Sequence, residues 1–218
     1  VHFTLSDSRS QVKPYPNESQ KIGDKIYYVG QYLGEIWGYT TVGIAKTDEE
    51  MNAHLAKVNQ NALGSEWAAG DIMYADLNGD GEINEGKNIV GDSGDKRIIG
   101  NNTPRYNFGL ILDGAWKNFD IQIFFQGTMK RDLWLGGNNG DGHQYWGASM
   151  LWHGIGLDAH KDYFRTADDP MGENLDAFYA RPIFGNAKNK QPQTRYIENG
   201  AYIRLKNIQI GYTLPSEW

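Results

Sequence analysis

Apolar side chains alternate with small or polar ones over much of residues 106–128, and this pattern limits the possible folds of the 218-residue chain more than any other feature. The residues that share one face of its first half are Tyr106, Phe108, Leu110 and Leu112. The positions between them are small or polar, except for Ile111. Side chains at i and i+2 point to the same side of a β-strand, so a period of two predicts a strand over residues 106–113.

A second alternating stretch follows after the short segment 114–119, which we interpret as a turn. Residues 120–128 place Ile121, Ile123 and Phe125 on one face, with polar residues between them. The two stretches therefore predict an antiparallel hairpin. Periodicity alone fits a transmembrane barrel and a soluble sandwich equally well, because strands alternate in both.

Two further strands are expected near the ends of the chain, at residues 1–5 and 202–214. In the second of these strands the apolar positions shift by one residue. Ile203 and Leu205 have odd numbers, whereas the apolar residues from Ile208 onward have even numbers. An extra residue inserted into a strand has this effect, so we expect a β-bulge near Lys206 and Asn207.

The lengths of the connections favour the barrel. Residues 6–105 and 129–201 are far longer than ordinary links, whereas the turn between the two central strands is short. In a spanning antiparallel sheet both long segments lie on one side, as in outer-membrane barrels, which have long extracellular loops and short periplasmic turns. We therefore predict an all-β fold, a fragment of a large transmembrane antiparallel β-barrel whose extracellular loops at 6–105 and 129–201 carry minor helix.

Composition narrows the function classes. The formal net charge is -6 and basic residues are scattered, so we expect no nucleic-acid partner. The chain contains no cysteine, which excludes disulfides and thiolate metal sites. No stretch of about 18 apolar residues is present, which excludes a membrane-spanning helix but not spanning strands.

The first long segment contains a predicted short helix. Thr47 and Glu50 have the spacing of a capping box, and Met51, Leu55 and Val58 follow at helical spacing.

Residues Asp76 to Asn84 match the first half of an EF-hand calcium loop. Oxygen-bearing side chains occupy positions 1, 3 and 5, and Gly81 at position 6 permits the sharp turn. Position 12 is Lys87, where a bidentate glutamate is needed, so the last carboxylate has to come from elsewhere. The predicted Ca²⁺ ligands are Asp76, Asn78, Asp80, Glu82 and Asp92, with Glu85 and Asp95 as further candidates. The alternative is a turn in which the aspartates cap their own backbone.

The second long segment is rich in glycine and tryptophan. The residues that could stack on sugar rings are Trp134, Tyr145, Trp146 and Trp152, with His143, His153 and Asp141 nearby. Substrate binding is one interpretation, and the other is that a large loop without a core uses these rings for its own packing.

No motif indicates an enzyme. Adjacent carboxylates such as Asp168 and Asp169 point in different directions, so they do not make an acid and base pair. HExxH zinc spacing, a GxSxG elbow and a phosphate-binding glycine loop are all missing from the sequence.

Motifs spread along nearly the whole chain resemble the closing third of SusC/RagA-type TonB-dependent transporters. They are, in order, 32–39 (YLGEIWGY), 43–44 (GI), 69–72 (AGDI), 74–83 (YADLNGDGEI), 99–100 (IG), 104–109 (PRYNFG), 118–120 (NFD), 125–127 (FQG) and 200–215 (GAYIRLKNIQIGYTLP).

The resemblance implies a barrel of about 22 strands with an N-terminal plug in the bacterial outer membrane. It implies import of glycans or peptides beneath a SusD-like surface lipoprotein, with energy from TonB. On this interpretation the chain is an incomplete stretch, residues 1–218 being part of the barrel, and its strands contact membrane lipid. TonB would bind through an N-terminal part that is missing here.

A second hypothesis comes from another class of protein. A secreted calcium-binding carbohydrate-recognition domain of β-sandwich type would also alternate and would also use the aspartate loop. It predicts folding without detergent and retention on an immobilised glycan.

Overall fold

The computed structural model describes residues 1–16, 19–23, 26–134, 158–183 and 188–215. Strands predominate, and every pairing between named strands is antiparallel. The elements in chain order are β1 (His2–Ser6), β2 (Glu35–Gly38), β3 (Thr41–Ile44), α1 (Asp48–Leu55), β4 (Ile72–Tyr74), β5 (Arg97–Asn101), β6 (Arg105–Trp116), β7 (Phe119–Lys130), β8 (Asp132–Trp134), η1 (Asp158–Lys161), η2 (Lys188–Lys190), η3 (Thr194–Tyr196), β9 (Ile197–Asn199) and β10 (Tyr202–Tyr212). Within the described residues, no helix has the length and apolar character that crossing a membrane requires.

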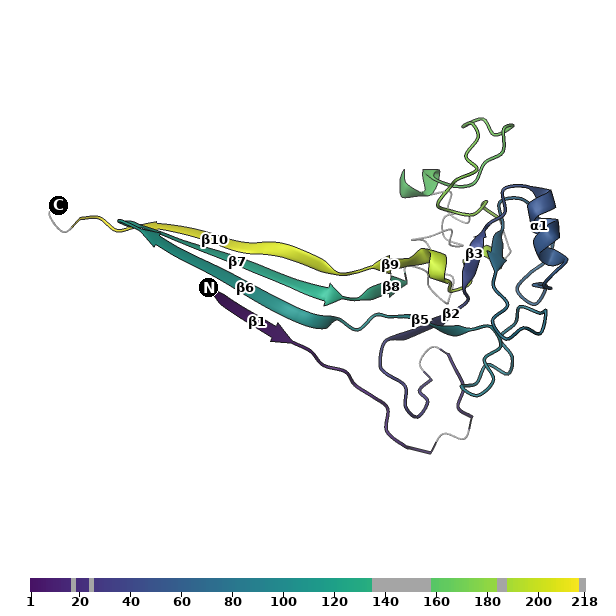
Figure 1. Cartoon of the computed structure of the whole chain (residues 1–218), viewed down its shortest axis with the longest axis horizontal. Coiled ribbons are helices and arrows are strands. Elements are labelled where there is room, and N and C mark those ends of the chain that lie inside the picture. The colour runs from purple at the N-terminus through teal and green to yellow at the C-terminus, as the bar shows by residue number, and fades with distance from the viewer. Residues whose placement is uncertain (17–18, 24–25, 135–157, 184–187, 216–218) are drawn as a thin grey trace.

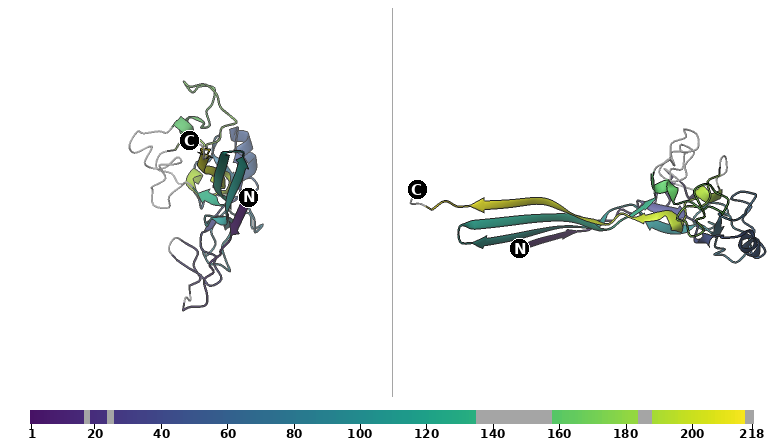
Figure 2. Two further views of the ribbon diagram at one scale, coloured as in Figure 1. Left: turned by 90° about the vertical axis from the view of Figure 1, so that its left-hand side faces the viewer. Right: turned by 90° about the horizontal axis from the view of Figure 1, so that it is seen from above.

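The molecule has two parts of different shape. Strands β1, β6, β7 and β10 form a long four-stranded sheet in the order β1-β6-β7-β10, which we call the blade (Figure 1). The remaining elements gather at one end of the blade into a compact group, which we call the head, and the view from above separates the two clearly (Figure 2). The all-β prediction is confirmed.

The central hairpin of the blade is tighter than expected. β6 and β7 each contain 12 residues and keep one register from Arg105 opposite Lys130 to Trp116 opposite Phe119. The ladder skips Tyr106, which has a φ of 55°, and Met129. Only Lys117 and Asn118 connect them, and Lys117 has a φ of 53°. Positive φ is typical of two-residue hairpin turns, whose twist matches that of the flanking strands. The turn is therefore shorter than the predicted segment 114–119.

The predicted bulge in the last strand is confirmed. The register of β10 against β7 shifts between Leu205 and Asn207. Leu205 lies opposite Phe125, and Ile208 lies opposite Ile123. Odd-numbered residues of β10 before the bulge and even-numbered residues after it therefore lie on the same face as the odd-numbered residues of β7. The inserted residue thereby keeps the apolar side chains of β10 on one side of the blade.

The head contains short strands that the sequence pattern did not predict. Within 6–105, β2 pairs with β5 and β3 pairs with β4, and within 129–201, β8 pairs with β9. Its main core is built from rings, with Tyr39 edge-on to Tyr74 at 5.6 Å and Tyr179 stacked on Tyr196 at 5.8 Å. The long segments expected as loops therefore carry their own folded core.

Helix α1 begins where the capping box predicts. The Thr47 hydroxyl accepts a hydrogen bond from the Glu50 N–H at 3.2 Å, as an N-cap should. The Glu50 carboxylate accepts from the Lys46 N–H at 2.6 Å, one residue before the expected Thr47. Met51 is fully buried, whereas Val58 lies beyond the end of the helix.

A buried charge cluster connects the two halves of the head. The Asp71 carboxylate, which is fully buried, accepts hydrogen bonds at 2.8 Å from two nitrogens of Arg181 and at 2.9 Å from the Asn189 amide. The Lys188 ammonium, also buried, lies 2.7 Å from Asp71 and donates to the carbonyls of residues 65 and 66. Burial raises the pKa of Asp71, but the donors on Arg181, Lys188 and Asn189 outweigh it and hold the pKa below its usual value.

Replacing Asp71 should destabilise the head strongly. Asp71→Ala in the intact protein leaves two cations without their shared carboxylate, and removing one partner of a buried ion pair costs about 3–5 kcal/mol. The stabilisation from the ionised carboxylate should be complete above the usual Asp pKa of 3.8 and should decline as pH falls through the lower folded value. Denaturant unfolding followed by tryptophan fluorescence measures both effects.

The matched control is Asp176→Ala, because Asp176 makes an exposed ion pair with Lys46. Exposed pairs contribute about 0–1 kcal/mol. Equal stability losses for the two variants would show that the Asp71 cluster does not hold the head together.

Candidate functional site

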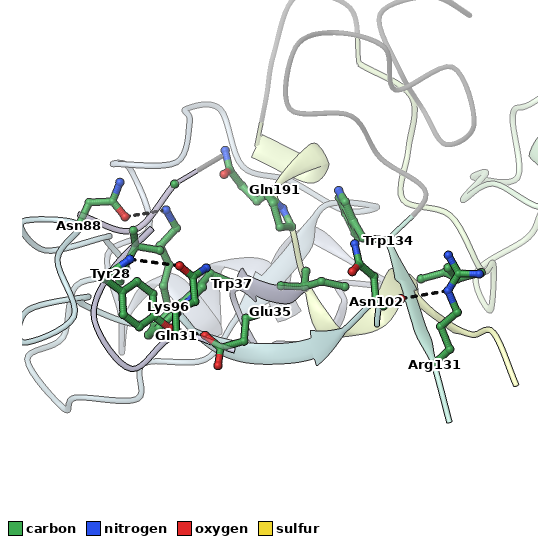
Figure 3. Close-up of a pocket in the computed structure, with 15 residues that line it drawn as sticks. Tyr28, Gln31, Glu35, Trp37, Asn88, Lys96, Asn102, Arg131, Trp134 and Gln191 are labelled. Atoms are coloured by element: carbon green, nitrogen blue, oxygen red, sulfur yellow. Dashed lines mark hydrogen bonds between the residues drawn. The ribbon is translucent and has the colours of Figure 1, made fainter. Parts of the chain in front are cut away.

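The described part of the head contains a cavity of about 610 Å³ beside the strands β2, β5 and β8 (Figure 3). Its walls come from segments far apart in the sequence. The residues drawn and labelled are Tyr28, Gln31, Glu35, Trp37, Asn88, Lys96, Asn102, Arg131, Trp134 and Gln191. A cavity of this size with aromatic walls and a few polar groups is typical of small-molecule sites.

One end of the cavity is a hydrogen-bonded cluster around Tyr28. The Tyr28 hydroxyl donates to the Glu35 carboxylate and accepts from the Trp37 indole at 3.2 Å. Glu35 also accepts from the Tyr32 N–H at 3.0 Å, and the Tyr28 N–H donates to the Gln31 side chain at 3.2 Å. Burial and the neighbouring carboxylate raise the pKa of the Tyr28 hydroxyl, so it stays protonated at neutral pH.

Charged side chains line the cavity, and two of them already donate hydrogen bonds to neighbouring groups. The Lys96 ammonium donates to Glu85 at 3.0 Å and to Asn88 at 3.2 Å. At the other end, the Arg131 Nε donates to the backbone carbonyl of Asn102 at 3.0 Å. The cavity therefore offers amides, a carboxylate and cations beside aromatic faces, a mixture that can hydrogen-bond a polar organic ligand.

A close backbone approach positions one wall. The Tyr39 N–H donates to the Pro192 carbonyl at 2.8 Å, which brings residues 191–192 against the end of β2. A Cβ on Gly38 would meet that carbonyl oxygen at 2.4 Å, so only glycine fits there.

The structure places the predicted aromatic residues in two groups. Trp134 lies at the end of β8 and lines the cavity together with Trp37. The other predicted substrate-binding residues, Tyr145, Trp146 and Trp152, lie outside the described residues, as do the neighbouring Asp141, His143 and His153.

The aspartate loop is held by its own hydrogen bonds. Asp76 accepts from the N–H groups of Gly79 at 2.6 Å and Gly81 at 2.8 Å. Asp80 accepts from the Glu82 N–H at 2.8 Å, and its own N–H donates to the Asn78 side chain at 3.0 Å. These bonds lower the pKa of Asp76, with Gly81 contributing most, so its carboxylate is ionised at neutral pH. Among the residues that the structure describes, no three acidic or histidine side chains group as a metal site requires.

Two further candidate ligands, Asp92 and Asp95, have other partners. Asp92 lies 3.5 Å from the Lys87 ammonium. The buried Asp95 accepts from the N–H groups of Leu77 at 2.8 Å and Asn84 at 3.0 Å, and so joins both ends of the loop. The Ca²⁺ site and the self-capped turn both stay predictions.

The cavity residues other than Trp134 were not predicted as site residues. The motif at 32–39 contains Glu35 and Trp37, which is the one local signal that marks this wall. Gln191 and Pro192 join it through contacts with residues more than 150 positions away, and a single sequence carries no sign of such contacts.

Comparison with known proteins finds similar receptors but no matching family model. No protein-family model matches the chain. Two curated proteins of Formosa agariphila are similar: TonB-dependent receptor P3, 28% identical over 194 residues, and TonB-dependent receptor P26, 25% identical over 193 residues. The alignments cover 89% and 88% of this chain but only 16% and 17% of the two receptors. The chain thus spans about one sixth of the length of these relatives.

The calcium prediction can be tested by titration calorimetry on the intact protein. If the aspartate loop binds Ca²⁺, Asp80→Ala should abolish its binding heat because one of the ligands that converge on the ion is lost. Asp176→Ala, an exposed carboxylate outside the loop, serves as control. Equal heats for the wild type and Asp80→Ala would reject the site.

Proposed function

We propose that this chain forms part of the barrel and outer loops of a TonB-dependent outer-membrane transporter. The similarity to two TonB-dependent receptors over almost the whole chain supports this class. The single observation that carries the proposal is that the blade has one apolar and one mainly polar face.

Strand register sorts the blade into one apolar and one mainly polar face. The apolar face carries Phe3, Leu5, Phe108, Leu110, Leu112, Trp116, Phe119, Ile121, Ile123, Phe125, Ile203, Leu205, Ile208, Ile210 and Tyr212. The opposite face carries His2, Thr4, Ser6, Arg105, Asn107, Asp113, Asp120, Gln122, Gln126, Thr128, Lys130, Arg204, Asn207 and Gln209, with Ile111, Phe124 and Tyr202 as its large apolar or aromatic members. Ile210 and Ile203 are 69% and 63% exposed, which in water would leave a very large apolar patch uncovered. A lipid-facing surface backed by a polar interior accounts for both faces.

The dimensions of the blade fit a membrane. Twelve residues at about 3.3 Å each extend roughly 40 Å, which a tilt of about 45° reduces to roughly 28 Å. The apolar band of outer-membrane barrels is about 25 Å tall. Two aromatic residues of the apolar face, Trp116 and Tyr212, lie beside the hairpin turn. Such residues anchor strands at the membrane–water interface.

The sidedness follows from the same sheet. The two-residue turn marks one end of the blade, and the head lies at the other (Figure 1). Since periplasmic turns are short and extracellular loops long, we propose that the head faces outward.

The cavity in the head supports import of an organic substrate. Trp37, Trp134 and Tyr28 provide aromatic faces, and the amides of Gln31 and Gln191 provide hydrogen bonds. We propose a SusC/RagA-type transporter that takes up glycans or peptides with a SusD-like surface lipoprotein, driven by TonB. This assignment rests on the motifs at 32–39, 74–83 and 200–215.

The sandwich alternative is less well supported. In a soluble sandwich one face of the sheet packs against a second sheet. In the part of the chain that the structure describes, no second sheet covers either face of the blade, and the two similar proteins are receptors by name.

Labels on neighbouring residues of β10 test the membrane assignment. The chain has no cysteine, so Ile208→Cys and Gln209→Cys each give one labelling site. In the intact protein, a spin label at 208 should report lipid and one at 209 should report water, because successive side chains point to opposite faces. Accessibility to oxygen and to a water-soluble relaxation agent measures this. Equal water exposure at both positions would contradict the assignment.

Substitution of Trp134 tests the cavity. Trp134→Ala in the intact protein should weaken binding of the preferred member of an oligosaccharide and peptide panel roughly tenfold, as for a central aromatic anchor. Trp134→Phe should retain most of the affinity, because it keeps a ring in place. Trp116→Ala, at the far end of the blade, is the control. If Trp134→Ala retains full affinity while its melting temperature is unchanged, the cavity is not the binding site.

A further inference from the structure

The polar face of the blade is unevenly charged along its length. Its charged residues on the side of the head are Arg105, Lys130 and Arg204. Near the hairpin turn the same face carries Asp113 and Asp120. Arg105 and Asp113 are eight residues apart on β6, which corresponds to roughly 26 Å. Positive charge therefore gathers at the head end of this face and negative charge at the turn end.

A hollow of about 280 Å³ lies at this basic end, where the blade meets the head. Arg105 and Lys130, which are ladder partners, line it together with Arg9, which follows β1. No carboxylate is among its described lining residues. Asp132, just beyond Lys130, lies outside this lining and accepts the Asn101 N–H at 2.9 Å. Three cations from three segments therefore converge on one site.

Two of these three cations have no ion pair among the described residues. Arg105 is neutralised, because it donates through Nε and one terminal nitrogen to the Asp7 carboxylate. The Arg9 guanidinium lies over the Tyr32 ring, 3.4 Å from its centroid. A guanidinium that stacks on a ring keeps the N–H donors at its edge for another partner. Lys130 is exposed, so both Arg9 and Lys130 can take up the charge of a ligand.

The hollow adjoins the larger cavity of the head. Adjacent residues line the two: Asn101 and Lys130 line the hollow, whereas Asn102 and Arg131 line the cavity. An extended substrate bound in the cavity can therefore reach the hollow with another of its groups.

We propose that this basic hollow binds carboxylate groups of the transported substrate where it passes from the head to the polar face of the blade. The inference rests on the proposed function, since it requires that this face lines the interior of a barrel. Arginine pairs with a carboxylate through two parallel hydrogen bonds, and Lys130 adds a point charge. Carboxylates are the anions that acidic sugars and acidic peptides share, so the hollow selects acidic substrates. Asp113 and Asp120 repel the same group, which confines its favourable position to the head end.

Binding of matched acidic and neutral ligands to the intact protein tests the proposal. One pair is a galacturonate trisaccharide and its methyl ester, and the other is a glutamate tripeptide and a glutamine tripeptide. Titration calorimetry of detergent-solubilised protein measures the four dissociation constants. The wild type should bind the acidic member of at least one pair at least tenfold more tightly than its neutral partner. The pair that shows this preference identifies the source of the carboxylate.

Removing the two unpaired cations should abolish the preference. Arg9→Gln with Lys130→Gln should weaken binding of the acidic ligand at least tenfold, because each lost hydrogen bond between charged groups weakens binding by about that factor. Binding of the neutral partner should be unchanged. Melting is measured alongside, and if the double variant melts early, Lys130→Gln alone gives the comparison, since this side chain is exposed.

The matched control is Lys57→Gln, which removes one exposed positive charge from the head just beyond α1. It should leave the preference for the acidic ligand unchanged, because Lys57 does not line the hollow.

Three results would overturn the proposal. They are the absence of a preference in both pairs for the wild type, a wild-type preference in the folded charge-removing variant, and an equal loss of preference in Lys57→Gln, which would assign the effect to overall charge. The labels at positions 208 and 209 separate the two levels of inference. If they report lipid and water while the preference is missing, only the carboxylate site fails; if both report water, the membrane assignment itself fails.

Discussion

The head depends on one buried carboxylate. Asp71 collects hydrogen bonds or ion pairs from Arg181, Lys188 and Asn189, which lie over 100 positions later in the sequence, and it also accepts from the Ala68 N–H at 3.0 Å. The buried rings of the head core are tyrosines, so the core itself contains polar hydroxyl groups beside its apolar surface. A fully bonded charge cluster specifies a single arrangement, since every displaced partner would leave a charge without compensation in a dry site.

The blade and the head differ in which side chains they bury and which they expose. In the head, the charged groups of the Asp71 cluster are buried with partners, whereas in the blade large apolar side chains are exposed. Hydrogen bonds between strands satisfy the backbone of the blade in any solvent, so the side chains alone decide which solvent suits it. The change from one arrangement to the other occurs within a few residues of Arg105 and Lys130.

Sequence reasoning succeeded where the signal is local. The hairpin, the bulge after Leu205 and the cap at Thr47 each follow from patterns only a few residues long. It missed the short strands of the head, because three to five residues are too few to show a period and their pairing joins segments about 30 to 65 positions apart. It also missed the cavity, whose walls meet only after Asp71 and the contact between Tyr39 and Pro192 bring distant segments together.

The bulge in β10 has a consequence for how such a chain can vary. The bulge inserts one residue that has no partner in β7. The alternation of side chains between the two faces on the head side of the bulge is therefore shifted by one residue from the alternation in the rest of the strand. A loop on the head side can therefore be inserted or exchanged with either parity of length, provided that one residue is gained or lost at the bulge. The head can therefore change in sequence and length while the alternation of side chains in the blade stays the same.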